Sequence, residues 1–69
     1  MANIADRLVS LQRERNIPKK DIAEAVGLSL MGYYRYERGI REPAASTIIA
    51  LCDYFGVSAD YLLGRSDKP

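Results

Sequence analysis

Apolar residues recur along the beginning of the chain at the spacing of a helix rather than that of a strand. The positions that share one helical face, at i, i+4 and i+7, are Ile4, Leu8 and Leu11. Asn3 can cap the start of this helix, and Asn16 can end it because asparagine tolerates the left-handed conformation. The pattern predicts a helix from about residue 4 to residue 15 or 16. The charged side chains expected in solvent are Arg7, Arg13 and Glu14.

The stretch from residue 19 to residue 38 contains two short helical patterns separated by a glycine. We expect one helix from residue 18 or 19 to residue 26 and another over residues 30–38. Ala23 is small enough for the two helices to cross closely, Gly27 ends the first, and Ser29 caps the second. The residues that define the spacing are Ile22, Ala23, Gly27 and Tyr33. Two helices joined by a short turn that contains glycine form a helix-turn-helix.

Two further helices are predicted in the second half of the chain. One covers residues 45–55 and is closed by Gly56; the other covers residues 59–63, begins after Ser58 and is ended by Gly64. The apolar face of the longer helix comprises Ile48, Leu51, Cys52 and Phe55. The sequence therefore predicts an all-α fold of five helices in one domain, residues 1–64. A polar tail at residues 65–69 is expected to fray.

The composition excludes several kinds of site. The 69 residues hold one cysteine, Cys52, and no histidine, so neither a zinc site nor a histidine general base can be built. A lone cysteine suits a reducing cytoplasm. No apolar run approaches the roughly 18 residues that span a membrane, and no signal segment follows Met1. We expect a cytoplasmic protein with no cofactor, no membrane contact and no evident small-molecule ligand.

The formal net charge of +1 conceals an uneven distribution of charge along the chain. Residues 7–41 hold eight Lys and Arg against four Asp and Glu, a net charge of +4, whereas residues 42–69 hold two against four, a net charge of −2. Such polarity is typical of a domain that turns a basic face toward a phosphate backbone. An ordinary solvated surface is the alternative on charge alone.

Together these motifs resemble the Cro/cI-type (XRE) helix-turn-helix family, the lambda-repressor-like DNA-binding domains. The matching residues extend over nearly the whole chain: Arg7-Leu8, Ile22-Ala23, Val26-Gly27-Leu28-Ser29, Arg35-Tyr36-Glu37 with Gly39, Pro43, and the run from Asp53 to Asp67. The resemblance implies a compact five-helix domain that binds palindromic operator DNA as a homodimer, with its third helix in the major groove. It also implies that Tyr33 and Tyr36 are buried.

The resemblance further implies a set of DNA-facing residues in the helix-turn-helix motif. They are Lys19 and Lys20 at the start of the second helix, Ser29, Leu30, Met31, Gly32, Tyr34 and Arg35 on the third, and Arg38 and Arg41 over the backbone. We expect the lysines to contact phosphates and Arg35 to contact a base. The alternatives are a surface salt bridge for Arg35 and an idle surface aromatic for Tyr34.

The chain departs from the family pattern at several positions. Pro18 stands where a serine N-cap is frequent, so the second helix lacks a cap worth about 1 kcal/mol. Lys19 replaces a frequent glutamine and, as a flexible point charge, braces its neighbours less. Gln12 replaces an arginine that usually pairs with the acid matched by Glu37, which leaves that carboxylate a neutral partner or water.

We interpret the chain as a sequence-specific DNA-binding transcriptional regulator, and within that class as a repressor of phage or prophage type. The first rival is a protein-binding module on the same fold, such as an antitoxin or a regulator's partner. Leu30 and Met31 are the best evidence for that rival, because such positions are more often polar. An enzyme is the weakest alternative, since no nucleophile–base pair or metal set is present.

We expect a two-fold dimer on DNA, because a single module of this size buries only about 600–1,000 Å² there. Half-sites about one helical turn apart match such a dimer. The residues that could supply apolar surface near the C-terminal end are Tyr54, Val57, Tyr61 and Leu63.

Leu30 and Met31 also lead to an expectation about the DNA sequence. Apolar side chains cannot read hydrogen-bond donors or acceptors, and the thymine methyl is the apolar group that the major groove offers. Gly32 beside them would let the helix approach closely. We therefore expect thymines opposite Leu30 and Met31 and a guanine opposite Arg35.

Overall fold

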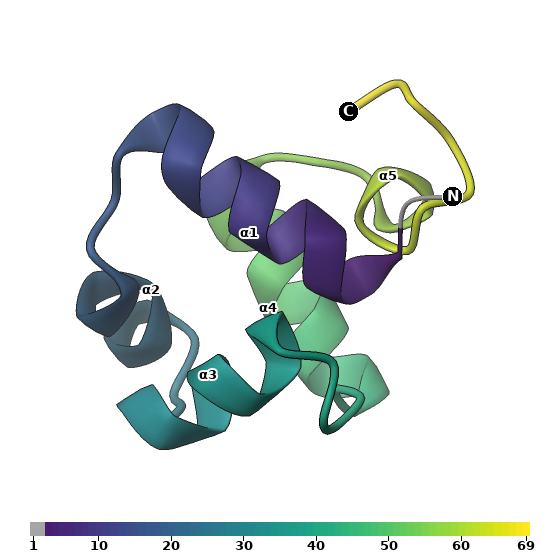
Figure 1. Cartoon of the computed structure of the whole chain (residues 1–69). Coiled ribbons are helices and arrows are strands. Elements are labelled where there is room, and N and C mark those ends of the chain that lie inside the picture. Colours follow the sequence, from purple (N-terminus) through teal and green to yellow (C-terminus); the bar gives the residue numbers. More distant parts are fainter. Residues whose placement is uncertain (1–2) are drawn as a thin grey trace.

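Five helices make up the regular structure of the computed structural model, which describes residues 3–69 (Figure 1). They are α1 (Ile4–Arg15), α2 (Lys19–Ala25), α3 (Leu30–Glu37), α4 (Ala45–Phe55) and α5 (Ala59–Leu62). The predicted all-α, five-helix fold is confirmed. The predicted ends of the second, third and fifth helices are one residue too long, because Val26, Arg38 and Leu63 are C-cap residues.

Side-chain caps determine where three of the helices begin. The capping residues are Asn3 for α1, Ser29 for α3 and Ser58 for α5. In each case the side-chain oxygen accepts a hydrogen bond from the backbone N–H three residues on, at 3.0 Å. Pro18 gives α2 no side-chain cap, as the sequence predicted. The start of α2 therefore depends on its packing against the rest of the fold.

Left-handed backbone conformations turn the chain between helices. Asn16 ends α1 with φ at 52°. Gly27 has φ at 74° in the turn between α2 and α3, and a Cβ atom added there would meet nothing within 4 Å. The turn therefore requires glycine for its backbone conformation and not for lack of space.

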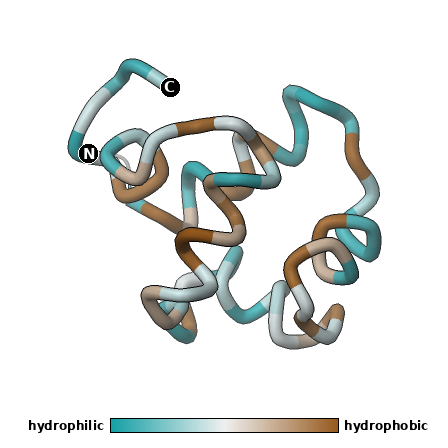
Figure 2. The backbone as a smooth tube through the Cα atoms, turned by 180° about the vertical axis from the view of Figure 1, so that it is seen from behind, coloured by the Kyte–Doolittle hydropathy of each residue, from teal (hydrophilic) through white to brown (hydrophobic). Residues whose placement is uncertain are grey.

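Every helix contributes to one hydrophobic core. The largest fully buried side chains are Leu8 and Leu11 of α1, Ile22 of α2, Tyr33 of α3, Leu51 of α4 and Leu62 of α5. α4 runs behind α1 in Figure 1, and Figure 2, drawn from the opposite side, shows strongly apolar positions along its turns. Of the predicted apolar face of α4, Leu51, Cys52 and Phe55 are buried, whereas Ile48 is partly buried.

The prediction that Arg7 faces solvent is wrong. Its side chain is only 13% exposed, and its guanidinium carbon lies 4.1 Å from the centroid of the Tyr61 ring. Arg7 Nη2 donates to the Asp67 carboxylate at 2.8 Å and to the Ser66 carbonyl at 3.2 Å. The polar tail that was expected to fray is thus bonded to α1 in this structure.

The arrangement leaves α3 at the margin of the molecule. The protein measures 28 × 23 × 19 Å, and α3 forms the lower edge in Figure 1, with α2 beside it. Because α3 lies at this edge, one face of it is available to a partner.

Within residues 3–69 no helix is both long enough and apolar enough to cross a membrane.

Candidate nucleic-acid interface

α2 and α3 form the helix-turn-helix expected from the sequence. The two helices pack against each other, with Ile22 fully buried and Ala23 only 1% exposed between them and the core. The Leu28 N–H donates to the Ala23 carbonyl at 2.8 Å, a hydrogen bond typical of helices that end at a glycine. Ser29 then caps α3 immediately after this turn, so α3 leaves α2 in a defined direction.

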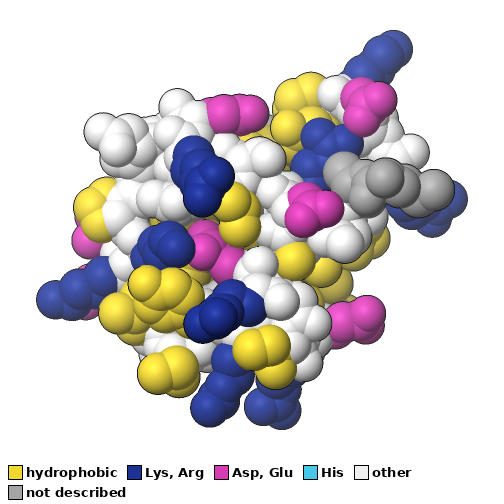
Figure 3. Space-filling model, viewed as in Figure 1, with side chains coloured by type: hydrophobic (Ala, Val, Ile, Leu, Met, Phe, Trp, Pro, Cys, Tyr) yellow, Lys and Arg dark blue, Asp and Glu magenta, His cyan; other side chains and the backbone are white. Residues whose placement is uncertain are grey.

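α3 has a buried face and an exposed face. Tyr33 is fully buried and Glu37, four residues on, is 7% exposed, so this line of α3 faces the core. Tyr36 is partly buried. The exposed line, at i, i+3, i+4 and i+7, consists of Met31, Tyr34, Arg35 and Arg38. Figure 3 shows Lys and Arg side chains interspersed with apolar side chains over this lower part of the molecule.

The exposed face of α3 is hollowed by a groove of about 350 Å³, which we call the outer groove. The residues that line it are Met31, Tyr34, Arg35, Arg38 and Ile40. Ile40 is 70% exposed, the most of any large apolar side chain among the described residues, and the sequence did not single it out. The sequence feature that could have identified Ile40 as exposed is its position between Arg38 and Arg41 in a mostly polar loop.

Most of the DNA-facing residues predicted from the resemblance lie on α3 or next to it. The exposed members of the set are Ser29, Leu30, Met31, Tyr34, Arg35, Arg38 and Arg41. Leu30 is 42% exposed and Met31 60% exposed, so this pair does not pack into the core. Lys20 lies on α2 with its side chain 74% exposed and its ammonium 3.9 Å from Glu24. These residues are free to meet a partner.

Lys19 differs from the other predicted contacts. Its Nζ lies 3.0 Å from Glu37 Oε1, and the side chains are 34% and 3% exposed respectively. Gln12 instead donates to the Ile17 carbonyl at 2.8 Å, in the turn between α1 and α2. The expectation that Glu37 has only a neutral partner or water is therefore wrong, because Lys19 supplies the cation that Gln12 cannot.

Tyr33 places a phenol in the interior beside this pair. Neither its hydroxyl nor Glu37 Oε2 has a hydrogen-bond partner among the described residues, and both atoms are buried. Burial raises the pKa of the Tyr33 hydroxyl, and the nearby Glu37 carboxylate raises it further. The Tyr33 side chain consequently stays neutral throughout the physiological range.

Gly32 is half-buried at the third position of α3. A Cβ atom added there would lie 3.2 Å from Ser29 Oγ, the atom that caps the helix. Any larger residue would therefore press on the cap. This local role accounts for glycine here without reference to a partner, and the proposed close approach to DNA stays a prediction.

Three exposed arginines, Arg35, Arg38 and Arg41, give this surface its charge. None of them takes part in an ion pair with another residue of the described chain. Arg7 and Arg15 are engaged elsewhere, on the tail and on the last carbonyl of α4 respectively. The positive excess of the first half of the chain is thus only partly located on α3 and the loop that follows it.

Residues 11–62 match the family model described as helix-turn-helix. The HTH-type transcriptional regulator AnsR of Bacillus subtilis is 35% identical over 63 residues, which cover 91% of this chain and 54% of that protein. The cryptic phage CTXphi transcriptional repressor RstR of Vibrio cholerae is 31% identical over 62 residues, covering 90% of this chain and 55% of that protein. The chain therefore spans about half the length of the curated relatives it matches.

A solved structure shows the same fold. The P22 c2 repressor, crystallised in complex with a synthetic operator, superposes with a TM-score of 0.88 at 24% sequence identity, covering 96% of this chain and all of that one. AnsR is a transcriptional regulator, and RstR and the P22 c2 protein are repressors. The chain belongs to the Cro/cI-type (XRE) helix-turn-helix family of DNA-binding domains.

Proposed function

We propose that this domain binds double-stranded operator DNA in the cytoplasm and regulates transcription, as a repressor, by placing the exposed face of α3 in the major groove. The observation that carries the proposal is a set of three exposed arginines along and just after α3 that form no ion pair within the part of the chain the structure describes. An α-helix fits the width of the major groove, and arginine is suited both to phosphates and to guanine.

The exposed residues divide into two kinds by their position. The first kind lies around the ends of the motif: Arg38 ends α3, Arg41 lies in the loop after it, and Lys20 lies on α2. Phosphate contacts from these side chains would fix the register of the domain on the duplex. Arg35 lies on the outer face of α3, where its fork can bond guanine O6 and N7 together. Ser29 uses its oxygen to cap α3, and its hydroxyl hydrogen is still available to a phosphate oxygen.

Salt dependence tests this proposal. Three phosphate contacts per protomer give a plot of log affinity against log salt with a slope of about −2.7, so affinity for a random duplex should fall about 40-fold between 50 and 200 mM salt. Fluorescence anisotropy with a labelled random duplex measures this directly. Affinity independent of salt would contradict DNA binding and favour the protein-binding rival, whose evidence is the exposed pair Leu30 and Met31.

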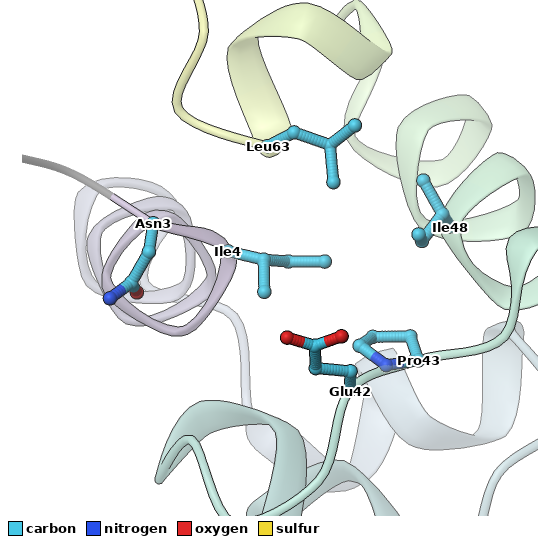
Figure 4. A pocket seen from close by; sticks show the side chains of 6 residues that line it. All are labelled: Asn3, Ile4, Glu42, Pro43, Ile48 and Leu63. Atoms are coloured by element: carbon cyan, nitrogen blue, oxygen red, sulfur yellow. The ribbon is translucent and has the colours of Figure 1, made fainter.

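We further propose that two copies bind the operator as a two-fold dimer. The prediction of an apolar surface near the C-terminal end is only half correct, because Val57 and Tyr61 are each 8% exposed and belong to the core. Tyr54 and Leu63 are 38% and 40% exposed. Leu63 also borders a hollow of about 210 Å³ beside the loop that follows α3, the lateral hollow of Figure 4. Its other lining residues are Asn3, Ile4, Glu42, Pro43 and Ile48.

The lateral hollow supports the dimer through its composition and position. The side chains of Ile4 from α1, Ile48 from α4 and Leu63, the C-cap residue of α5, point into it (Figure 4). It adjoins the α3–α4 loop, which lies next to the surface proposed to meet DNA. Leu63→Glu should weaken binding to a duplex with two half-sites while leaving binding to a single half-site unchanged. Equal affinity for both duplexes in the wild-type protein would contradict a dimer.

A further inference from the structure

One ammonium group connects the interior of the helix-turn-helix with its exposed face. Lys19 Nζ lies 3.0 Å from Glu37 Oε1 and 4.7 Å from the centroid of the Tyr34 ring. Glu37 is the last residue of α3 and Tyr34 lies one turn earlier, so Lys19, the first residue of α2, contacts two sites on the neighbouring helix. A lysine ammonium has three N–H donors and can serve a carboxylate and an aromatic face together.

The pair with Glu37 is not an ordinary surface salt bridge. The Glu37 side chain is 3% exposed, and Glu37 is the one buried charged residue among those described. Its second oxygen, Oε2, has no hydrogen-bond partner in residues 3–69, so the Lys19 ammonium is the charge that compensates the carboxylate. A buried carboxylate that loses such a partner is strongly unfavourable. The Lys19 ammonium is therefore held in place by its pairing with the buried Glu37 carboxylate.

The contact with Tyr34 carries this restraint to the outside of α3. Tyr34 is 38% exposed and lines the outer groove with Arg35. Because the ammonium is fixed by Glu37, it also fixes the ring whose face it contacts. Lys20, the next residue along the chain, differs in both respects, since its side chain is 74% exposed and its nearest acid is 3.9 Å away.

We propose that Lys19 is a positioning residue for base reading and not a phosphate contact: it sets the Tyr34 ring in the outer groove through its pairing with buried Glu37. The proposal rests on the proposed DNA-binding function of α3. It reverses the role that the resemblance implied for this position. It also gives the departure from glutamine at residue 19 a reason, because glutamine carries no charge to offset Glu37.

The adjacent lysines provide a matched pair of variants, Lys19→Gln and Lys20→Gln. The tightest duplex selected from a random pool, and single-base-pair variants of it, serve as probes over a range of salt concentrations. We expect Lys19→Gln to reduce discrimination between these duplexes at least several-fold with an unchanged salt slope. Lys20→Gln should make the slope shallower by about 0.9 and leave discrimination unchanged. Glu37→Gln should release the Lys19 ammonium and steepen the slope.

The opposite pattern would overturn the proposal: a slope made shallower by about 0.9 in Lys19→Gln with discrimination intact identifies a phosphate contact. Should Lys19→Gln fail to fold, Tyr34→Leu tests the same link, and unchanged discrimination in that variant would also overturn it. Thermal unfolding of Lys19→Gln, Glu37→Gln and the double variant decides the pairing without DNA. If the changes in Tm of the two single variants add up to that of the double variant, Lys19 and Glu37 are not coupled, whether or not the protein binds DNA. If the wild-type protein binds no duplex, the proposed function is refuted, but the pairing of Lys19 with Glu37 is not.

Discussion

Removal of single methyl groups from the operator offers a sharp test of how α3 reads DNA. Leu30 and Met31 are the first two residues of α3, and they are 42% and 60% exposed. In this type of motif the N-terminal residues of this helix reach the base edges. Each therefore has substantial apolar surface to cover on binding. Replacing thymine by uracil removes only the C5-methyl group and leaves the hydrogen-bonding edge of the base unchanged.

The expected magnitude follows from the size of the group. Burial of a CH₂-sized group is worth about 0.8 kcal/mol, which corresponds to a change in affinity of about fourfold at 25 °C. Two such thymines in one half-site would give about fifteenfold if their effects are additive. Both values are measurable by fluorescence anisotropy on duplexes that carry uracil at one of these thymines or at both.

A double variant serves as the control. In Leu30→Ala, Met31→Ala the apolar surface is absent, so the thymine and uracil duplexes should bind equally well. Uracil at thymines outside the half-sites should have no effect in either protein. If no uracil substitution within the half-site changes the affinity of the wild-type protein, Leu30 and Met31 do not read methyl groups. The protein-binding rival would then gain support from the same exposed pair.

Four further predictions concern base reading and stability. Arg35→Ala should cost about 1–3 kcal/mol of binding and relax preference at one base pair per half-site, measured across single-base-pair variants; equal weakening of every duplex would make it a phosphate contact. Ser29→Ala removes the cap of α3 and should lower the free energy of unfolding by about 1 kcal/mol in a urea titration. Leu62→Ala, at a fully buried position, should lower it by about 2–5 kcal/mol, and a loss below 1 kcal/mol would contradict the packing described. Because the pKa of Tyr33 is raised in the folded state, the unfolded chain loses its phenolic proton first, so the contribution of Tyr33 to stability should be constant below about pH 10 and be lost above it; Tyr33→Phe should reduce the fall in stability above about pH 10.

The helices were predictable because their signals are local. Asn3 and Ser29 cap α1 and α3 as predicted, and Gly27 adopts the positive φ that its place between two apolar patterns indicated. Leu51 and Phe55 fall on the buried face that their spacing predicted. Such features depend on residues within one or two turns of the chain, which is the range over which periodicity and capping are informative.

The errors involve contacts between distant parts of the chain. Arg7 fits a solvent position by periodicity, but the tail supplies Asp67 and α5 supplies Tyr61 to cover it. The partner of Glu37 is Lys19, which lies eighteen residues earlier and meets it only once α2 packs on α3. No periodic pattern encodes such pairings. The resemblance implied a cation at residue 12 as the usual partner of Glu37, but residue 12 is glutamine here and Lys19 of α2 pairs with Glu37 instead.

DNA binding through α3 is tested most directly by a map of backbone amide shifts in ¹⁵N-labelled protein on titration with the selected duplex. If the exposed face of α3 lies in the major groove, the largest changes will fall between Ser29 and Arg41, together with the side-chain Nε–H of Arg35. Amides of the exposed α1 residues Arg13 and Glu14 will stay unchanged. If the largest changes fell on α1 and the amides of α3 did not shift, α3 would not be the helix that meets DNA.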